Sequence, residues 1–452
     1  MYNAYITEIK EIKKHSNADR LFLTECFGNQ VIIDGSMKVG DTVVYFPTDG
    51  RLSEEYCQIN NLIGSNDPVT GEHKGGYFDS RRKISTLKLR KEVSDGFIMP
   101  IESLSYTGIK IDTLKPGMMF ETINGYPICE KYVTQATRSH GQNQGKPGKR
   151  SFRETISYPI FSEHKDTEQM FYNMNQLKEG MVLVITVKMH GTSGRTSYSL
   201  CEKTSKIGNI INYVYGNIFK KKLVQPKSEW KYVSGTRRVT IKDIEKRNSG
   251  FYGDKEEFRT VAHNLFLGKL AKGETVYYEI VGWVSPSTPI MPKVSNEKLK
   301  DKEFVKKYGK ETIFNYGCLP GQSEVYVYRM SMTNVDGIEV DYDWETVKRR
   351  CEEMSIKHVV EVDKFIFHDD IVEVDPQNSC KESFKKYCEE KVVGEDPIGK
   401  THIKEGIVVR VDGCKWKAWK HKSVEFKILE GLIKEDESVI DIEEEQEQIK
   451  EI

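Results

Sequence analysis

Residues Met181–Ser193 read MVLVITVKMHGTS, and their first seven members are all apolar or β-branched. Such a run is typical of a strand that is buried on both faces. It ends at Lys188, two residues before a His-Gly-Thr-Ser turn. The pattern therefore predicts a primary amine at the rim of a core. Because a lysine attacks an electrophile only when neutral, a nucleophilic role requires neighbouring cations, a metal ion or desolvation, and a solvated strand-end lysine is the ordinary alternative.

The length, charge and cysteine content of the chain exclude few classes of protein. Its 452 residues suggest two or three domains, and 68 basic residues balance 68 acidic ones. Basic residues gather at 138–153, 220–222 and 415–427, and acidic ones at 435–451. Nine cysteines without a CxxC pair favour reduced thiols over a zinc site. There is no signal peptide and no apolar run of about 18 residues, so we expect a soluble cytoplasmic protein without a membrane partner.

Residues 1 to 120 alternate short strand patterns with glycine turns, which predicts a small β-barrel. The candidate strands are Ala4–Ile12, Leu21–Cys26, Gln30–Asp34 and Thr42–Phe46. The segments HSNADRL (His15–Leu21) and KVGDTVVYFP (Lys38–Pro47) resemble the OB-type modules attached to tRNA-binding proteins and certain ligases.

Basic residues alternate with strand positions in Lys83–Pro100. Lys83, Lys88 and Arg90 are candidate contacts for RNA on an electropositive barrel face. Solvated lysines that protect a sheet edge are an equally good interpretation.

A stretch rich in Gly, Gln and Arg at 135–153 indicates a linker or an RNA-contacting loop, and a second domain follows it. Helical spacing of apolar residues predicts one helix at Asp254–Leu270, with a core stripe of Phe258, Val261 and Leu265. A second helix is expected at Asp343–Met354, with Trp344, Val347, Cys351 and Met354 on its stripe. Further strands are expected at Thr275–Trp283, Glu324–Arg329, Gly406–Val411 and Lys415–Lys422.

Several of these strands carry polar side chains where a plain core strand would have none. They are Glu279 within an apolar run, Glu405 beside Gly406, the one-face pair Tyr326 and Tyr328, and the one-face pair Lys420 and Lys422. The two lysines would lie about 7 Å apart. Like charges at that distance repel unless an anion lies between them, and a polyphosphate is such an anion.

These residues fall into an ordered series of short motifs. The series is K-x-H-G at Lys188–Gly191, S-G-T-R at Ser234–Arg237, Y-x-E-I-x-G at Tyr277–Gly282, the aromatic strand Tyr326–Tyr328, E-G-x-V at Glu405–Val408 and K-x-K-S at Lys420–Ser423. The ordered set resembles the covalent nucleotidyltransferase superfamily of ATP-dependent ligases and capping enzymes. HKDTEQ at His164–Gln169 is similar to an element that precedes the nucleophile in the RNA ligases of that superfamily.

Two departures favour the nick-sealing RNA ligase branch with an N-terminal OB domain. The third motif residue is His190, whereas DNA ligases and capping enzymes usually have aspartate there. Those enzymes also need an OB domain after the K-x-K motif, and the 30 residues after Lys422 are too few for one. We therefore expect an α+β fold with an OB-like barrel at 1–125, a basic linker at 126–154, a nucleotidyltransferase domain of mixed antiparallel sheets at 155–430 and an acidic tail at 431–452.

The resemblance implies ATP-dependent joining of RNA 3′-hydroxyl and 5′-phosphate ends, as in RNA repair. Lys188 would form lysyl-AMP, and Mg²⁺ or Mn²⁺ would be held by Glu405. The other implied nucleotide-binding residues are His190, Gly191, Glu279 on the ribose, Lys420 and Lys422 on the phosphate, either Arg195 or Arg237, and either Tyr326 or Tyr328 on adenine. The expected partners are ATP and RNA or an RNA-containing duplex.

Three alternatives remain open at this point. A capping guanylyltransferase uses the same lysine chemistry with GTP, and a DNA ligase uses it on DNA. A non-catalytic RNA-binding protein could also be built on a transferase fold. The intact set of lysines and glutamates argues against this last alternative.

Overall fold

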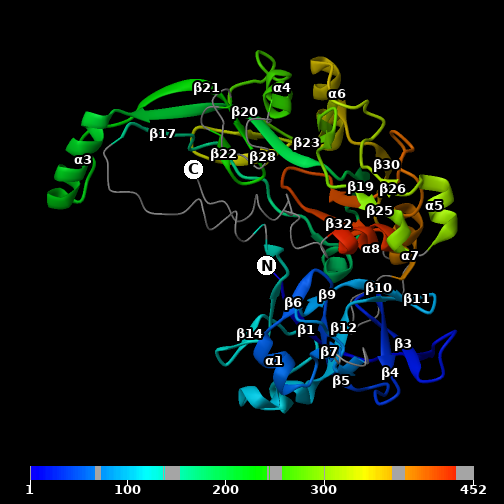
Figure 1. Ribbon diagram of the computed structural model, residues 1–452. Coiled ribbons are helices and arrows are strands. Elements are labelled where there is room, and N and C mark those ends of the chain that lie inside the picture. Colours follow the sequence, from blue (N-terminus) through cyan, green and yellow to red (C-terminus); the bar gives the residue numbers. More distant parts are fainter. Residues whose placement is uncertain are drawn as a thin grey trace. The chain divides into compact units, whose positions relative to one another are not determined.

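The computed structural model describes residues 2–66, 73–135, 137, 153–241, 244, 257–299, 301–368 and 382–433. The basic residues at 138–152, most of the expected linker and the acidic residues after 433 lie outside these ranges. The chain divides into two compact units, which Figure 1 shows together. Unit 1 comprises Met1–Val133, Ile371–Tyr387 and Lys427–Glu435, and unit 2 comprises Thr134–Asp370, Cys388–Phe426 and Asp436–Ile452. No helix in the described ranges is long and apolar enough to cross a membrane.

Unit 1 consists mainly of short strands. Its elements are β1 (Ala4–Glu8), β2 (Lys13–Lys14), β3 (Leu21–Cys26), β4 (Asn29–Asp34), β5 (Thr42–Phe46), β6 (Gly50–Leu52), α1 (Glu54–Ile59), β7 (Gly64–Asn66), β8 (His73–Gly75), β9 (Lys83–Ile84), β10 (Thr86–Leu89), β11 (Glu92–Asp95), β12 (Phe97–Pro100), η1 (Ile101–Thr107), η2 (Ile111–Thr113), β13 (Met119–Phe120), β14 (Thr122–Ile123), β15 (Tyr126–Pro127) and β16 (Cys129–Lys131). The four strands expected near the N-terminus are present, although the first of them ends at Glu8 and not at Ile12.

The core of unit 1 lies against a four-stranded antiparallel sheet in the order β12-β5-β1-β13. Alternating apolar residues place Ala4, Ile6, Val44 and Phe46 in that core. Two three-stranded sheets, β16-β6-β9 and β2-β3-β4, and three hairpins complete the strands of the unit. Among the described residues these sheets do not close into one barrel, which differs from the expectation for this half of the chain.

Unit 2 carries the longer strands and most of the helices. Its elements are β17 (Thr155–Ser157), β18 (Glu168–Gln169), η3 (Phe171–Gln176), β19 (Val182–Lys188), β20 (Thr192–Thr204), α3 (Lys206–Phe219), β21 (Lys227–Gly235), β22 (Thr240–Ile241), α4 (Glu257–Asn264), β23 (Glu274–Ser285), β24 (Thr288–Pro289), β25 (Val294–Ser295), η4 (Asn296–Leu299), α5 (Lys302–Tyr308), β26 (Glu311–Thr312), β27 (Ser323–Thr333), β28 (Glu339–Asp341), α6 (Trp344–Met354), β29 (Lys357–His358), β30 (Glu361–Ile366), β31 (Gly406–Val411) and β32 (Ala418–Lys422). Two helices, α7 (Glu382–Val392) and α8 (Val424–Ile433), each contribute residues to both units.

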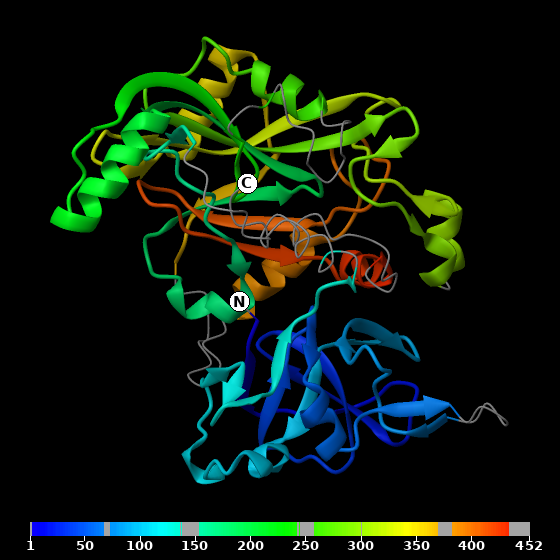
Figure 2. The ribbon, with the colours of Figure 1, turned by 60° about the vertical axis from the view of Figure 1, so that its left-hand side comes forward.

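Two sheets dominate unit 2 and form two layers (Figure 2). The nine-stranded sheet follows the order β22-β21-β20-β23-β27-β28, with β17, β24 and β29 paired beside this path. The five-stranded sheet has the order β18-β32-β31-β19-β30. Because β19 lies inside the second sheet, the five residues between its first and last positions are all buried, as the apolar run predicts. The α+β class with antiparallel sheets therefore holds.

The two expected helices of unit 2 differ in outcome. The stripe on α6 is confirmed, since the buried residues of that helix are the four expected ones and Asp343 caps its N-terminus. The stripe on α4 is confirmed only at Phe258, because Val261 and Leu265 are exposed. The buried face of α4 is turned toward β20, where Arg259 donates to Thr192 Oγ1 at 2.7 Å and His263 Nδ1 contacts Thr196 Oγ1 at 3.1 Å. The spacing of apolar residues in the sequence does not predict that polar residues such as Arg259 and His263 are buried, because their hydrogen bonds are not visible in that spacing.

Candidate active site

Three ionisable side chains meet where β19, β31 and β32 lie side by side. Gly406 pairs with Lys188 on one side and with Lys422 on the other. Glu405, the residue before it, therefore lies between the two amines, with Oε1 2.8 Å from Lys188 Nζ and 3.2 Å from Lys422 Nζ. The Glu405 side chain is fully buried. Such a carboxylate is tolerable only beside opposite charge, which the two lysines supply.

The strand pairing leaves no space for a side chain at Gly406. A Cβ atom there would collide with the main-chain oxygen of His421. This glycine lets β31 and β32 approach closely, so that the two amines converge on one carboxylate. The E-G pair in the sequence thus has a geometric reason.

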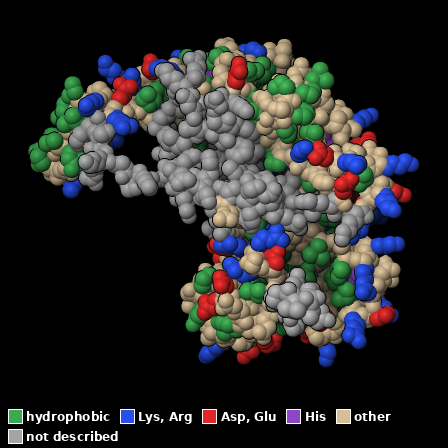
Figure 3. All heavy atoms as spheres, viewed as in Figure 1, with side chains coloured by type: hydrophobic (Ala, Val, Ile, Leu, Met, Phe, Trp, Pro, Cys, Tyr) green, Lys and Arg blue, Asp and Glu red, His purple; other side chains and the backbone are tan. Residues whose placement is uncertain are grey.

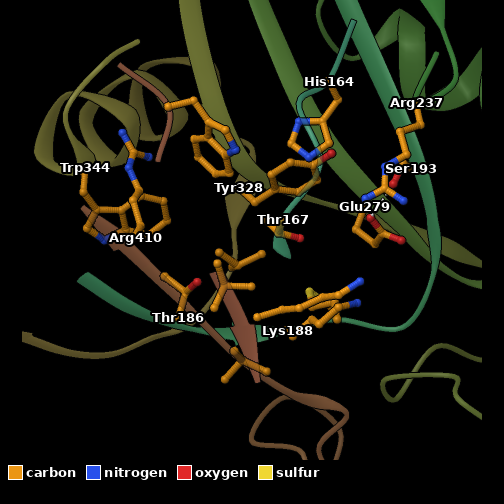
Figure 4. A pocket seen from close by; sticks show the side chains of 16 residues that line it. His164, Thr167, Thr186, Lys188, Ser193, Arg237, Glu279, Tyr328, Trp344 and Arg410 are labelled. Carbon is orange, nitrogen blue, oxygen red and sulfur yellow. Dashed lines mark hydrogen bonds between the residues drawn. The ribbon is translucent and has the colours of Figure 1, made fainter. Parts of the chain in front are cut away.

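A cavity lies between the two sheets of unit 2 (Figure 4). Five of the residues expected in the site line it: Lys188, Arg237, Glu279, Tyr328 and Lys420. Lys188, Ser193, Glu279 and Arg237 lie toward one end of the cavity, and Trp344 and Arg410 lie toward the other. One end of the cavity is therefore lined by charged and polar groups, and the other, the aromatic end, combines the Trp344 ring with the Arg410 guanidinium.

Glu279 is held by a neighbouring strand. The pairing of β20 with β23 sets Ser193 opposite Glu279, and Ser193 Oγ donates to Glu279 Oε2 at 3.2 Å. The carboxylate lies at the cavity wall although the residue is largely buried. Ser193 was not among the expected site residues, and its only signal in the sequence was its place in the turn after Lys188.

The two candidate arginines have different surroundings. Arg195 is almost fully buried, and its guanidinium donates to four main-chain oxygens, including those of Thr236 at 2.9 Å and Arg238 at 3.2 Å. Burial lowers the pKa of Arg195 to about 10. Arg237 instead lines the cavity, with its Nε 3.3 Å from Asp166 Oδ1. Arg195 thus braces the S-G-T-R turn, and that turn presents Arg237 to the cavity.

The two candidate tyrosines are also separated by the structure. The register of β27 against β23 shifts by one residue, since Tyr277 pairs with Arg329 while Tyr278 pairs with Val327. Tyr328 lies at this bulge and lines the cavity. Tyr326 is not among the lining residues, and its hydroxyl donates to Glu324 Oε2 at 2.7 Å.

His190 does not line the cavity. Its main-chain N–H donates to the Tyr316 hydroxyl at 2.5 Å, and its ring packs edge-on against Phe314 and Phe426, with ring centres 4.6 and 4.9 Å away. Its Nδ1 lies 3.9 Å from Glu405 Oε2. Burial and the charge of Glu405 raise the pKa of Tyr316 well above its usual range, so the phenol stays neutral. Motif spacing gave no signal for Tyr316, which lies more than a hundred residues away in the chain.

The turn between β19 and β20 also depends on close packing. A Cβ atom at Gly191 would collide with the main-chain oxygen of Ile280 on β23. Gly191 thus lets this turn pass close to the strand that carries Glu279, and no side chain of Gly191 is available to a ligand.

His164 is a cavity residue that the sequence did not single out individually. Its ring centre lies 5.2 Å from that of Tyr328 and 5.7 Å from that of Trp416. Burial, reinforced by Arg237 and Arg329, lowers its pKa well below the usual range, so the imidazole is neutral. Its Nδ1 has no hydrogen-bond partner within the described ranges. A neutral, buried imidazole at the cavity wall can recognise a polar edge of a bound ring.

The donor set fits a metal that is shared with a phosphate. Within the described part of the chain, no three His, Cys, Asp or Glu side chains cluster closely enough to hold a metal by themselves. Glu279 lies on the cavity wall, and Glu405 is a separate carboxylate that is buried beside Lys188, a lining residue. Mg²⁺ is commonly held by one or two carboxylates together with water and substrate phosphates, so these residues suit such an ion.

The basic residues expected to contact RNA lie in unit 1. Lys83 Nζ donates to the main-chain oxygen of Gly431 at 2.9 Å and lies over the Tyr132 ring, so it has a structural role. Lys88 is exposed on the β10–β11 hairpin. Arg90 is exposed at its turn and donates to the main-chain oxygen of Asn17 at 3.3 Å.

Comparisons with known proteins bear on the fold. Neither a protein-family model nor a characterised protein sequence matches the chain. A lysine-to-alanine variant of Naegleria gruberi RNA ligase, solved with ATP and Mn, is similar over 94% of this chain and 96% of that chain, with a TM-score of 0.52 and 14% sequence identity. A second lysine-to-alanine variant with ATP and Mn gives a TM-score of 0.53 at 14% identity over 94% and 98% of the chains.

The same Naegleria gruberi enzyme solved with PPi gives a TM-score of 0.52 at 15% identity, over 94% of this chain and 97% of that chain. The similarity extends through both units, since it covers nearly all of each chain. This chain therefore has the fold of these RNA ligases.

Proposed function

We propose that the protein is an ATP-dependent RNA ligase that works through a lysyl-AMP intermediate. The observation that carries the proposal is the convergence of Lys188 and Lys422 on the buried Glu405, beside a cavity that Glu279, Arg237 and Tyr328 line. This combination is suited to a nucleotide whose phosphate must be attacked by an amine.

In the proposed first step, Lys188 Nζ bonds to the α-phosphorus of ATP as the bond to pyrophosphate breaks. Lys420 and Lys422 offset the charge of the α-phosphate in the transition state. Before the attack, the Lys188 ammonium group passes its proton to solvent water in the cavity, and the neutral amine supplies the electron pair of the new N–P bond. A divalent ion held by Glu405 would supply further charge neutralisation. AMP then passes to an RNA 5′-phosphate, and an RNA 3′-hydroxyl displaces it.

The ends of the cavity suggest how the nucleotide lies in it. Glu279 would accept hydrogen bonds from the ribose hydroxyls, with Arg237 beside it. The adenine would stack on Tyr328 toward the aromatic end, with His164 Nδ1 facing the edge of the base. His190 would act from outside the cavity, because its packing and its bond to Tyr316 fix the chain just after Lys188.

Unit 1 is proposed to be an OB-like module that holds RNA, with Lys88 and Arg90 as its exposed contacts. We retain the boundaries 1–125 and 155–430 for the two functional domains, with the linker and acidic tail outside them. We propose that the reaction takes place in the cytoplasm and that nicked RNA-containing duplexes are its substrates.

The proposal is tested by incubating the protein separately with ATP, GTP and NAD, each labelled at the phosphate next to the nucleoside, followed by a denaturing gel. We expect label only from ATP, and loss of label in Lys188→Ala and Lys188→Arg but not in Lys302→Ala, an exposed lysine on α5. Label from GTP would indicate a capping enzyme. The absence of label from all three would contradict the proposal and favour a binding protein.

Joining activity distinguishes RNA from DNA ligation. A 5′-phosphorylated nick with a ribonucleotide 3′-hydroxyl should be sealed faster than its all-DNA counterpart, since 2′-hydroxyls allow a protein to select RNA. Preference for the all-DNA nick would refute the choice of substrate while leaving the lysine chemistry intact.

A further inference from the structure

Helix α3 stands at the end of an arm of unit 2 formed by β20 and β21 (Figure 1). The two strands pair continuously from Arg195 opposite Gly235 to Lys203 opposite Lys227. From the sequence, only the three lysines at 220–222 stand out in this region. The helix KIGNIINYVYGNIF was not predicted, because its glycines and β-branched residues favour helix weakly.

The polar side of α3 faces its own chain. Asn209 Nδ2 donates to the main-chain oxygen of Arg153 and to Thr155 Oγ1, each at 2.7 Å. Asn212 donates to the main-chain oxygen of Val224 at 2.8 Å and accepts the N–H groups of residues 223 and 224. These bonds fix which side of the helix points away from the arm.

The outward side of α3 is apolar. Ile207, Ile211, Val214 and Ile218 follow one another at helical spacing and are 70%, 37%, 55% and 67% exposed. At 100° per residue, this stripe is centred roughly opposite the two asparagines. The helix is therefore amphipathic in the reverse sense to an ordinary surface helix, which turns its apolar side inward. Figure 3 shows hydrophobic side chains gathered over this part of the molecule.

The surroundings of the stripe are cationic. Residues 204–228 contain five lysines and no acidic residue. The lysines stand at both ends of the helix, at positions 206, 220, 221, 222 and 227, and all five are exposed. Within the described ranges none of them forms an ion pair, whereas neighbouring Lys203 and Lys231 pair with Glu154 and Glu229.

We propose that α3 docks the protein on an anionic lipid surface. Such a surface offers an apolar layer for the isoleucines and negative headgroups for the flanking lysines. A 14-residue helix is about 21 Å long, shorter than the roughly 30 Å hydrocarbon core, so it would lie in the interface rather than cross it. The expectation of no membrane partner rested on the absence of a long apolar run and did not address a short surface helix.

Other occupants explain the observations less well. RNA would satisfy the lysines but would leave the isoleucine stripe in water. A second copy would cover the isoleucines but would bring two sets of lysines together, and residues 204–228 contain no acidic side chain to offset their charge. An anionic surface with an apolar layer matches both features.

The test is flotation of the full chain with vesicles made of equal parts of phosphatidylcholine and phosphatidylserine. The protein should float with these vesicles at low salt, and much less with phosphatidylcholine alone or at high salt. Ile211→Asn and Ile218→Asn should each weaken partitioning about ten-fold, because each removes an aliphatic side chain from the lipid. Val261→Asn is the matched control, since this exposed valine lies on α4 outside the stripe, and it should have no effect.

Replacing lysines 220–222 together by glutamine should remove the preference for phosphatidylserine while leaving the circular dichroism spectrum unchanged. Equal flotation of all variants, or no flotation of the parent chain, would overturn the proposal. If the glutamine variant instead loses affinity for an RNA duplex and the parent ignores vesicles, the arm is an RNA contact. A dimer in sedimentation that Ile211→Asn dissociates would assign the stripe to a second copy. Since no residue of the nucleotide site is changed, these outcomes are independent of ligase activity.

Discussion

We expect substitutions of Glu405 and of Lys188 to lower the stability of unit 2 by different amounts. The carboxylate is fully buried and neutralises Lys188 at 2.8 Å and Lys422 at 3.2 Å. Glu405→Gln would leave two largely buried ammonium groups next to each other without a counter-charge. Removing the central partner of a buried ion pair costs about 3–5 kcal/mol. Lys188→Met leaves the pair of Glu405 with Lys422 in place, and should cost about 1 kcal/mol.

Tryptophan fluorescence can follow this effect in unit 2 alone, because every tryptophan of the chain lies there. They are Trp230, Trp283, Trp344, Trp416 and Trp419. With a urea dependence of about 3 kcal/mol per molar, Glu405→Gln should lower the midpoint of urea unfolding by about 1–1.7 M, and Lys188→Met by about 0.3 M. The measurement is made on the full chain without nucleotide.

The double variant isolates the electrostatic part of the effect. In Glu405→Gln with Lys188→Met only one buried cation remains, so the double variant should be more stable than Glu405→Gln alone. Equal losses from the two single variants, or a double variant whose loss is the sum of both, would refute the idea that Glu405 serves as the shared counter-ion.

Three further predictions concern the cavity wall and its support. Arg195→Ala should destabilise unit 2 by about 3 kcal/mol, because several buried main-chain carbonyls lose their hydrogen-bond donor. Arg237→Ala should leave urea unfolding almost unchanged but raise the ATP concentration needed for half-maximal adenylylation. The reverse pattern would exchange the roles of the two arginines. Tyr328→Ala should weaken ATP binding about ten-fold through lost stacking, while Tyr326→Ala should change it less than about three-fold. Equal effects of the two variants in calorimetric titration would show that Tyr328 is not the tyrosine that stacks on adenine. Burial lowers the pKa of His263 to about 4, below the unfolded value of about 6.5. The unfolded chain therefore takes up a proton at His263 first, and stability should fall as the pH drops from about 6.5 to 4. This pH dependence of stability should be smaller in His263→Gln, and an unchanged dependence would show that other groups cause it.

The parts of the site that depend on local strand order could be predicted from the sequence. The buried run before Lys188 becomes β19, and the E-G and K-x-K patterns become neighbouring positions on β31 and β32. The pairing of these strands then brings lysines and glutamate together. Residue type and alternation carry this information because a strand has a fixed period.

The alternation of residues along the strand could not predict the bulge at Tyr328, because the pairing with the partner strand decides where a one-residue insertion occurs. The choice between Arg195 and Arg237 depended on which guanidinium meets main-chain oxygens, and that is a property of a turn and not of a motif. The inward packing of His190 against Phe314 and Phe426 depends on segments far apart in the chain. Packing between segments that are far apart in the chain does not produce a periodic pattern in the sequence.

Helix α3 shows a different limit. Hydrophobic periodicity identifies an apolar stripe but assumes that it faces the core. The bonds of Asn209 and Asn212 to the arm reverse that assumption. Only the structure shows that the stripe points outward.

The central claim is that Lys188, and not another amine of the cavity, carries the nucleotide. The direct measurement is mass spectrometry of peptides from the protein after reaction with ATP and a divalent metal, under alkaline conditions that preserve a phosphoramidate. We expect one AMP adduct per chain, on the peptide that contains Lys188. An adduct on Lys420 or Lys422, or no adduct on an intact and folded protein, would contradict it.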